Sequence, residues 1–128
     1  MRTPGLFRGR KKDRTGSVAP PPKPEDFNPD SFFAGIAWHQ RWEMYQGVYT
    51  PGRNPVAEFM DRASVPVDLT DRTVLDIGTW NGAFAFECAR RGARRVVGFG
   101  PEDPEKTGFN KIRSQLGLTN VDYVIGSV

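Results

Sequence analysis

The stretch TVLDIGTWNGAFAFECARRGA, from Thr73 to Ala93, decides the fold of this 128-residue chain. Val74 to Ile77 form a short, almost continuously apolar run, as expected of a parallel strand that is covered on both faces. A glycine-containing turn follows, and the next residues fit a helix with Asn81 as its cap and Gly92 as its stop. A strand, a turn and a helix in this order form the unit that holds nucleotide-like ligands.

The sequence after Gly92 continues the alternation of strand and helix. Arg95–Phe99 is predicted as a second strand, and a second helix follows with Asp103 as cap and Pro104 at its first position. The residues of this helix that face the sheet are Phe109, Ile112 and Leu116, and Gly117 ends it. Val121–Ile125 is predicted as a third strand. The predicted fold class is α/β, a partial doubly wound (Rossmann-like) parallel sheet with three strands visible, preceded by a helical N-terminal segment.

Three regions are predicted: a basic, Pro-rich flexible tail (1–27), an aromatic-rich helical and turn segment (28–70) and the Rossmann-like part (71–128). In the middle region we expect a helix that begins at Asp30 or Ser31 and ends at Gly47. The residues of its apolar face are Phe33, Ile36, Ala37, Trp38, Arg41, Trp42 and Tyr45. The following YTPG, Tyr49 to Gly52, has the chemistry of a type II turn. Asn54 then caps a helix that Pro66 closes.

Charge and composition indicate which classes of partner, location and chemistry are compatible with this sequence. Residues 1–27 hold seven Lys or Arg and three acidic residues, a charge of +4, while the other 101 hold eleven and twelve, a charge of −1, which together give the net charge of +3. Such an arm either adds salt-sensitive affinity for RNA or DNA or is a solvated solubility tail. With neither a membrane span nor a signal peptide in the sequence, we expect a soluble cytoplasmic protein. Cys88, the single cysteine, is interpreted as a core residue rather than a reactive thiol, and no metal site is predicted.

The turn after the first strand, Gly78 to Gly82, is where this fold binds its ligand. The dinucleotide fingerprint G-x-G-x-x-G would need glycine at Trp80 and Ala83, so an NAD site is disfavoured. What remains is a carboxylate, Asp76, at the strand's end and a turn with fewer glycines and a bulky indole. A carboxylate accepts a hydrogen bond from an ammonium group, which favours an amino-acid-bearing nucleoside over a pyrophosphate.

These residues resemble a known family. VLDIGTWNGAFAFECARRGA is similar to the first motif of class I S-adenosylmethionine-dependent methyltransferases, and residues 36–127 resemble the branch related to the tRNA 5-methoxyuridine (wobble uridine) methyltransferases. The resemblance implies S-adenosylmethionine as cofactor and methyl transfer to an oxygen or nitrogen of an RNA base, a glycan or a small molecule. His39 and Gln40, with Tyr49–Gly52, would lie over the mouth of the site. Around the methionine part of the cofactor it places Asp76, Gly78, Thr79, Trp80, Asn81 and Gly82.

Two features depart from the family pattern. The family has an acidic residue for the ribose hydroxyls at the end of its second strand, where this chain has Gly100; Glu102 or Asp103 either replaces it or only starts a helix. The family fold also has about seven strands, of which three are visible, so the chain resembles the N-terminal half. Its first strand would expose an apolar edge, which favours a complementing chain or a homo-oligomer. The alternative function is a non-catalytic binding or assembly module, or an inactive fragment.

Several polar and aromatic residues have two interpretations each. His39 is either a general base facing the transferred methyl group or a structural histidine, and no catalytic residue is assigned from the sequence. Arg94 and Arg95 either contact a phosphate or solvate a loop. Three further aromatic residues either stack a nucleobase or belong to the core, namely Trp38, Trp42 and Tyr45.

Overall fold

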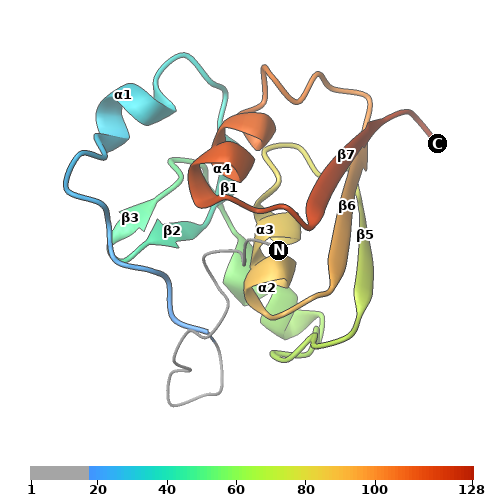
Figure 1. The fold of residues 1–128 in the computed structure, drawn as a ribbon. Coiled ribbons are helices and arrows are strands. Elements are labelled where there is room, and N and C mark those ends of the chain that lie inside the picture. Colours follow the sequence, from blue (N-terminus) through green and yellow to red (C-terminus); the bar gives the residue numbers. More distant parts are fainter. Residues whose placement is uncertain (1–17) are drawn as a thin grey trace.

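The computed structural model describes residues 18–128 (Figure 1). Its centre is a three-stranded parallel sheet in the order β5-β6-β7, made of β5 (Thr73–Ile77), β6 (Arg95–Gly100) and β7 (Val121–Ile125). The crossover after β5 contains α3 (Ala83–Arg90), and the one after β6 contains α4 (Phe109–Leu116). The predicted α/β class and the order of these elements are therefore confirmed.

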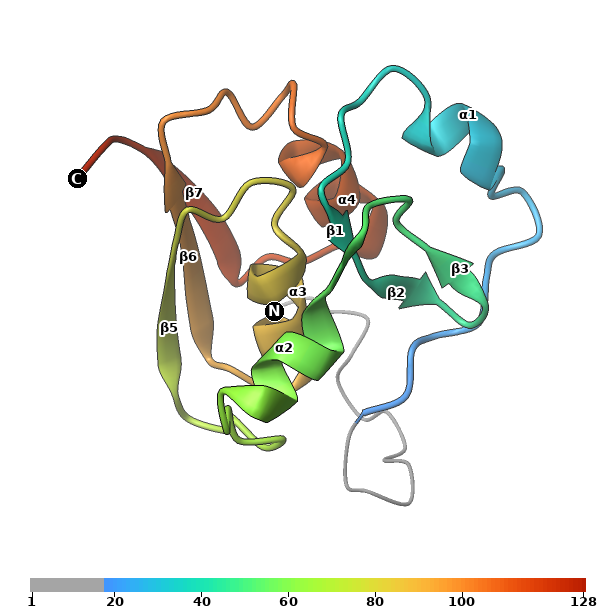
Figure 2. The same cartoon turned by 180° about the vertical axis from the view of Figure 1, so that it is seen from behind.

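The helices lie on one side of this sheet, as the two opposite views in Figures 1 and 2 show. Alternate strand residues point toward them, and Val96 and Val121 are fully buried there. From α4 the residues Phe109, Ile112 and Leu116 are fully buried, which confirms the predicted face of that helix. Burial of each such side chain contributes roughly 1.5–3 kcal/mol to folding.

The opposite face of the sheet is apolar and open to solvent within the described part of the chain. Leu75 and Ile77 on β5 are 60% and 58% exposed, and Val124 on β7 is 48% exposed. β5 hydrogen-bonds only to β6, so its outer edge has no partner strand among residues 18–128. Strands with this composition are normally covered on both faces.

The N-terminal segment differs from the predicted helix, which was wrong beyond residue 33. Asn28 caps a short α1 (Pro29–Phe33), and the chain then forms β1 (Gln40–Arg41) and a hairpin of β2 (Glu43–Tyr45) and β3 (Val48–Tyr49). Burial alternates here, because the side chains of residues 40, 42 and 44 are buried while those of 39 and 41 are exposed. Gly47, with φ of +72°, closes the hairpin instead of ending a helix.

The second predicted helix is present as α2 (Val56–Arg62), although Asn54 does not cap it. Asn54 and Pro55 form β4, which pairs in parallel with β1. Gly52 is not the third residue of a type II turn, because its φ is not positive. A Cβ atom at Gly52 would collide with the backbone of Gln40, so the glycine permits two chain segments to approach closely.

The second crossover helix starts later than predicted. α4 begins at Phe109 after Gly108, whose φ is +82°, and not at Pro104. The Asp103 carboxylate accepts a hydrogen bond from the Glu105 N–H at 2.9 Å and so stabilises a turn before the helix. A Cβ atom at Gly108 would stand 2.6 Å from the Trp38 ring, so this glycine permits the close approach of Trp38 to the start of the helix. Gly117 ends the helix in the left-handed conformation, as predicted.

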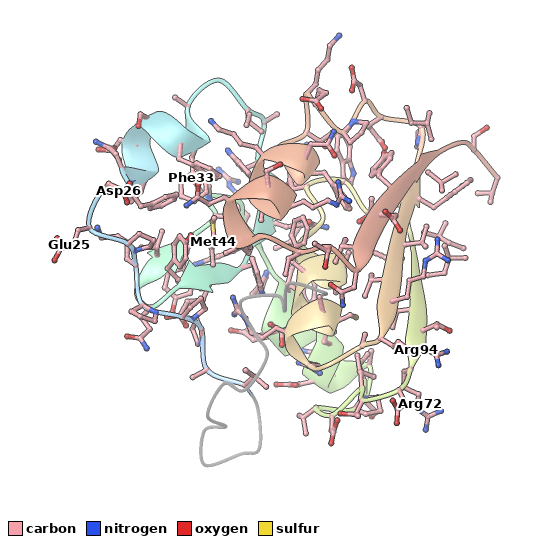
Figure 3. All side chains as sticks on the ribbon, in the orientation of Figure 1. Glu25, Asp26, Phe33, Met44, Arg72 and Arg94 are labelled. Atoms are coloured by element: carbon pink, nitrogen blue, oxygen red, sulfur yellow. The ribbon has the colours of Figure 1, made fainter. Side chains whose placement is uncertain are left out.

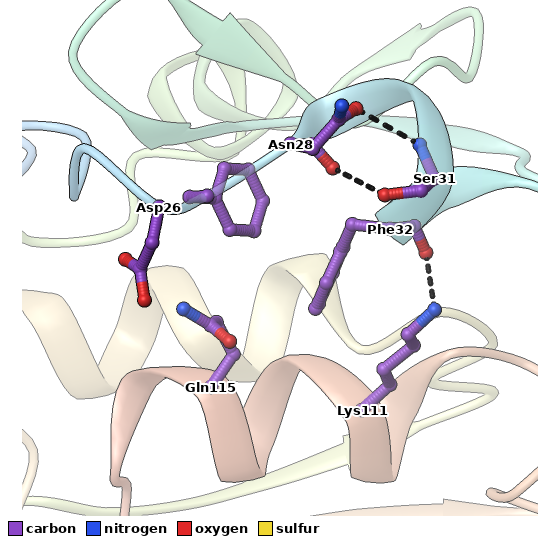
Figure 4. Close-up of a pocket in the computed structure, with 7 residues that line it drawn as sticks. Asp26, Asn28, Ser31, Phe32, Lys111 and Gln115 are labelled. Carbon is purple, nitrogen blue, oxygen red and sulfur yellow. Dashed lines mark hydrogen bonds between the residues drawn. The ribbon is translucent and has the colours of Figure 1, made fainter.

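Residues 18–27, assigned above to a flexible tail, pack against the body, whereas residues 1–17 of that tail lie outside the described part. Pro21 accepts a hydrogen bond from the Gln46 N–H at 2.8 Å, and Phe27 is buried. A cavity of about 340 Å³ lies where this segment and α1 meet α4 (Figure 4). Lys111 spans it by donating to the Phe32 carbonyl at 2.6 Å. None of the described helices has the length and apolar character needed to cross a membrane.

Candidate functional site

Three loops border the carboxyl ends of the parallel strands, where this class of fold binds ligands (Figure 1). They are residues 34–39 before β1, residues 78–82 between β5 and α3, and residues 101–108 between β6 and α4. The predicted site residues at positions 78–82 therefore lie at the expected edge of the sheet. Arg72 and Arg94 mark the opposite end (Figure 3), where the Arg94 N–H donates to the Arg72 carbonyl at 2.8 Å. Arg95 begins β6 at the same end, so Arg94 and Arg95 are both remote from the turn.

The first half of the turn is exposed. Gly78 has a φ of +77°, and no atom lies within 4 Å of the position that a Cβ atom would take, so the backbone borders open space. Its N–H donates to the Phe99 carbonyl at 2.7 Å, which joins the turn to β6. Trp80 has a φ of +52°, a left-handed conformation that is rare for a bulky residue, and its side chain is 41% exposed. A ligand at this edge would meet the Gly78 backbone and the indole.

Asn81 does not cap α3, contrary to the sequence-based prediction; Gly82 occupies the cap position. The Asn81 carboxamide oxygen accepts from the N–H groups of His39 at 2.9 Å and Gln40 at 3.3 Å. Its nitrogen donates to the carbonyls of Ala37 at 3.1 Å and Thr107 at 2.9 Å. One buried side chain therefore joins all three loops, and its amide is engaged in the protein rather than turned toward a ligand.

Gln40 supplies the cap that Asn81 does not. Its side-chain oxygen accepts from the N–H of Ala83, the first residue of α3, at 2.9 Å, and its nitrogen donates to the Thr79 carbonyl at 3.3 Å. A helix start binds anions through free N–H groups. Because the Ala83 N–H is already used, this helix start is less suited to a phosphate.

Two of the predicted site residues, Thr79 and Gly82, are packing residues. A Cβ atom at Gly82 would stand 2.5 Å from the Phe109 ring and 2.7 Å from the Phe86 ring, so the glycine admits close contact between α3 and α4. The side chain of Thr79 is fully buried and lies against Gly98 of β6. These two residues fix the turn by packing against the core, and the Thr79 side chain is not exposed to a ligand.

Asp76 points to the α3 side of the sheet and is partly buried. Burial raises the pKa of its carboxyl above the ordinary value of 3.8. Hydrogen bonding with the Thr79 side chain and with the Ala85 backbone lowers the pKa but does not cancel this rise. The Oδ2 atom is buried and has no hydrogen-bond partner within residues 18–128. Asp76 also lines an apolar groove of about 210 Å³, which includes Phe84 and Cys88. An unpartnered carboxylate oxygen can accept a proton donor from a ligand.

Glu102 lies beside Gly100, at the end of β6. Its Oε2 atom lies 2.7 Å from the position of a Cβ atom on Gly100, so the carboxylate fills the space of a side chain at the end of β6. That oxygen is buried and has no partner in the described part of the chain. The Tyr123 hydroxyl donates to the Glu102 carbonyl at 2.8 Å and holds the residue in place. Burial, and then the charges of Glu102 and Asp103, raise the pKa of Tyr123 above 10.0, so the hydroxyl keeps its proton at neutral pH.

The aromatic residues divide into core and surface. Trp42 and Tyr45 are buried and Trp38 is partly buried, with its indole N–H bonded to the Phe33 carbonyl, so the core interpretation holds for these three. His39 is exposed, and its ring centroid lies 4.3 Å from that of Trp80 with an angle of 42° between the planes. His39 therefore lies at the mouth of the site, as expected.

A buried charged cluster on α3 was missed in the sequence. Arg91 and Glu87 form an ion pair at 2.8 Å, and Glu87 also accepts from the Trp42 indole N–H at 2.9 Å. Arg90 donates to the carbonyls of Glu43 at 2.7 Å and Met44 at 3.0 Å. The signal available in the sequence was the spacing of Glu87 and Arg91, which are four residues apart.

Metal-binding and thiol chemistry find little support in residues 18–128. No three His, Cys, Asp or Glu side chains gather there in a way that could hold a metal ion. Cys88 is buried, and burial, reinforced by the charges of Asp76 and Glu87, raises the pKa of its thiol to about 12. The thiol is thus protonated and shielded, as expected of a core residue.

Comparison with known proteins identifies the fold. No family model and no curated protein sequence matches the chain. The C-terminal domain of precorrin-6Y C5,15-methyltransferase from Rhodobacter capsulatus aligns with 79% of this chain and 47% of its own, at 18% identity and a TM-score of 0.52. This likeness shows the fold alone.

Two further solved structures align over about half of this chain, with TM-scores below 0.5. Phosphoethanolamine N-methyltransferase 1 from Haemonchus contortus, in complex with phosphoethanolamine and S-adenosylhomocysteine, matches 52% of the chain at 28% identity and a TM-score of 0.43. The PRMT1 enzyme–prozyme complex with AdoHcy from Trypanosoma brucei matches 47% at 22% identity and a TM-score of 0.42. The chain spans 14% and 18% of these two proteins, respectively.

Proposed function

We propose that this chain binds S-adenosylmethionine at the carboxyl ends of β5 and β6 and belongs to a class I methyltransferase. The observation that carries the proposal is a pair of buried carboxylate oxygens that have no hydrogen-bond partner within residues 18–128. They are Asp76 Oδ2 on β5 and Glu102 Oε2 in the loop directly after β6. Buried acceptors of this kind call for a ligand that brings hydrogen-bond donors. The fold, shared with a methyltransferase domain, supports the same assignment.

The donors of S-adenosylmethionine match these acceptors. Asp76 would hold the ammonium group of the methionine part, and Glu102 would accept from the ribose hydroxyls, the role that an acidic residue has in dinucleotide sites. Gly78 would allow the cofactor to approach the backbone. Gln40 already occupies the Ala83 N–H at the start of α3, which disfavours a pyrophosphate there. When bound, the cofactor supplies an electrophilic methyl group, and the chain contributes chiefly by orienting it.

We further propose an RNA base as methyl acceptor, as in the wobble-uridine branch that the sequence resembles, with a glycan or small-molecule hydroxyl as the alternatives. The exposed residues beside the mouth support RNA. His39 and Trp80 are exposed and their rings contact each other there, and aromatic groups of this kind stack nucleobases. The basic charge within residues 1–27 would add salt-sensitive affinity. A single buried cysteine is consistent with a cytoplasmic location.

The apolar sheet face that no helix covers within residues 18–128 favours a partner for this chain. Leu75 and Ile77 are exposed beside the unpaired edge of β5, so we propose either a complementing chain or a second copy at this edge. A non-catalytic binding or assembly module with the same fold is the second candidate function. It would bind its partner through this face and would not need the cofactor.

The decisive experiment is a calorimetric titration of the full chain with S-adenosylmethionine and S-adenosylhomocysteine. We expect saturable binding by the wild type and a loss of about tenfold or more in affinity for Asp76→Asn and for Glu102→Gln, because each removes a hydrogen bond to a charged group. Asp103→Asn is the matched control, since this neighbouring carboxylate is exposed and bonds to Glu105.

The outcomes separate the two candidate functions. Binding that both site variants weaken and the control does not would support the methyltransferase. A folded wild type that binds neither compound would reject the cofactor site and favour the assembly module. Equal weakening by all three variants would mean that the carboxylates act only through the general charge of this edge.

A further inference from the structure

The groups at the carboxyl ends of β5 and β6, around the turn 78–82, favour a cation. Two carboxylate oxygens there, on Asp76 and Glu102, are acceptors that no group in the described part of the chain engages, and the first N–H of α3 is already bonded to Gln40. The most exposed large side chain within the turn is Trp80, an indole without charge. The face of an indole carries the negative part of its quadrupole and attracts cations more strongly than the face of any other aromatic side chain.

Trp80 is held in this exposed position at an energetic cost. A φ of +52° is unfavourable for a bulky residue and persists only where the surroundings fix it. Here the Gly82 N–H bonds to the Thr79 carbonyl at 2.8 Å across Trp80, and the next residue, Asn81, is fixed by four hydrogen bonds. The His39 ring contacts the indole, yet 41% of the Trp80 side chain stays exposed. The backbone therefore presents an indole surface toward the ligand edge.

We infer that Trp80 contacts the sulfonium cation of S-adenosylmethionine and thereby distinguishes the cofactor from its product. This inference rests on the proposed function. Methyl transfer converts the sulfonium, a permanent cation, into the uncharged thioether of S-adenosylhomocysteine, whereas the ammonium group is common to both. An indole contact would thus favour the methylated form and promote release of the product. From the strength of cation–π contacts, the preference is about threefold to thirtyfold.

The test compares two ligands on three proteins. Wild type, Trp80→Leu and Trp80→Phe are titrated with S-adenosylmethionine and S-adenosylhomocysteine in parallel. We expect Trp80→Leu to lose about threefold to thirtyfold in affinity for the sulfonium compound while its affinity for the thioether stays within about twofold, with Trp80→Phe in between. Neither replacement is glycine, so both keep the unfavourable φ, and their thermal unfolding reports whether the turn is intact.

The results that would overturn the inference are distinct from failure of the proposed function. If Trp80→Leu binds both compounds as the wild type does, or loses the same factor for both, the indole does not recognise the charge, although the cofactor site stands. If a folded wild type binds neither compound, the proposed function and this role of Trp80 fail together.

Discussion

Cys88 and Asp76 show how burial acts on single groups beneath the turn. Both line the apolar groove between α2, α3 and β5, and burial raises the pKa of both. The charge of Asp76 adds to the rise at Cys88. The pKa of both groups is therefore raised for a shared reason, namely an apolar surrounding that solvates charge poorly.

The thiol of Cys88 should be inert in the folded protein. With a pKa of about 12 instead of 9.0, it stays protonated up to strongly alkaline pH. Between these values the unfolded thiol loses its proton and the folded one keeps it, so the free energy of unfolding falls as pH rises, by up to about 1.4 kcal/mol per pH unit. Iodoacetamide labelling at pH 8 should be slow until denaturant is added. Urea unfolding at pH 8 and pH 10 measures the fall.

The control is Cys88→Ala, which removes the titrating group and should have a smaller fall in stability over the same pH range. Rapid labelling of the native wild type at pH 8, or identical pH dependence in the two proteins, would contradict the prediction.

Among the elements, α3 connects the sheet to the N-terminal hairpin. Its buried Glu87 bonds to the Trp42 indole and pairs with Arg91, which is itself buried. Glu87→Gln would leave that arginine with less compensation, and breaking a buried pair from one side costs about 3–5 kcal/mol. We expect a loss near the lower value, because Arg91 also donates to the Val65 and Pro66 carbonyls.

Urea denaturation of Glu87→Gln beside Glu58→Gln measures this contribution. Glu58 lies on α2 and is exposed, so its replacement should change the free energy of unfolding by less than about 0.5 kcal/mol. A loss of the same small size for Glu87→Gln would show that the buried pair adds little to stability.

The elements also differ in how well the sequence predicted them. From Thr73 onward, strands and helices follow local signals, such as the apolar run before Gly78 and the glycine at 117, and their order was predicted correctly. In the N-terminal segment the aromatic residues fit a helical spacing, yet Trp42 and Met44 are buried in an alternating pattern. Tertiary packing against α3 decides between the two, and no local pattern reports it.

The same limit applies within the candidate site. The position of the turn could be predicted, because Asp76 and Gly78 are neighbours in sequence. The role of Asn81 could not, since its partners at residues 37, 39 and 40 lie more than forty residues away. Glu102 and Asp103 were both candidates, and only the fold shows that the carboxylate of Glu102 is the one beside Gly100.

On the scale of the whole molecule, the main feature of residues 18–128 is the apolar face of the sheet that no helix covers (Figure 1). The exposed apolar residues on the outer strands β5 and β7 favour association through that face or through the edge of β5. We expect sedimentation velocity to show concentration-dependent association of the wild type, and Ile77→Lys to shift it toward the monomer. A charged side chain would oppose burial of the face without entering the core, since Ile77 is 58% exposed.

Val67→Lys is the matched control, because Val67 is also exposed but lies outside the sheet. Its association should equal that of the wild type. A wild type that stays monomeric at high concentration would argue against self-association and leave a different chain as the partner for this face.

The hydrogen bonds of Asn81 determine whether the three loops at the carboxyl ends of the strands become ordered during folding or only on ligand binding. Loops that order only on contact with a ligand lose conformational entropy at that moment, and the affinity is lower for it. Here the loops before β1, after β5 and after β6 are already joined through one side chain, 1% exposed, that needs no ligand. The entropy of these loops is therefore lost during folding, and a ligand that binds at the turn, as proposed above, would bind more tightly by the corresponding amount.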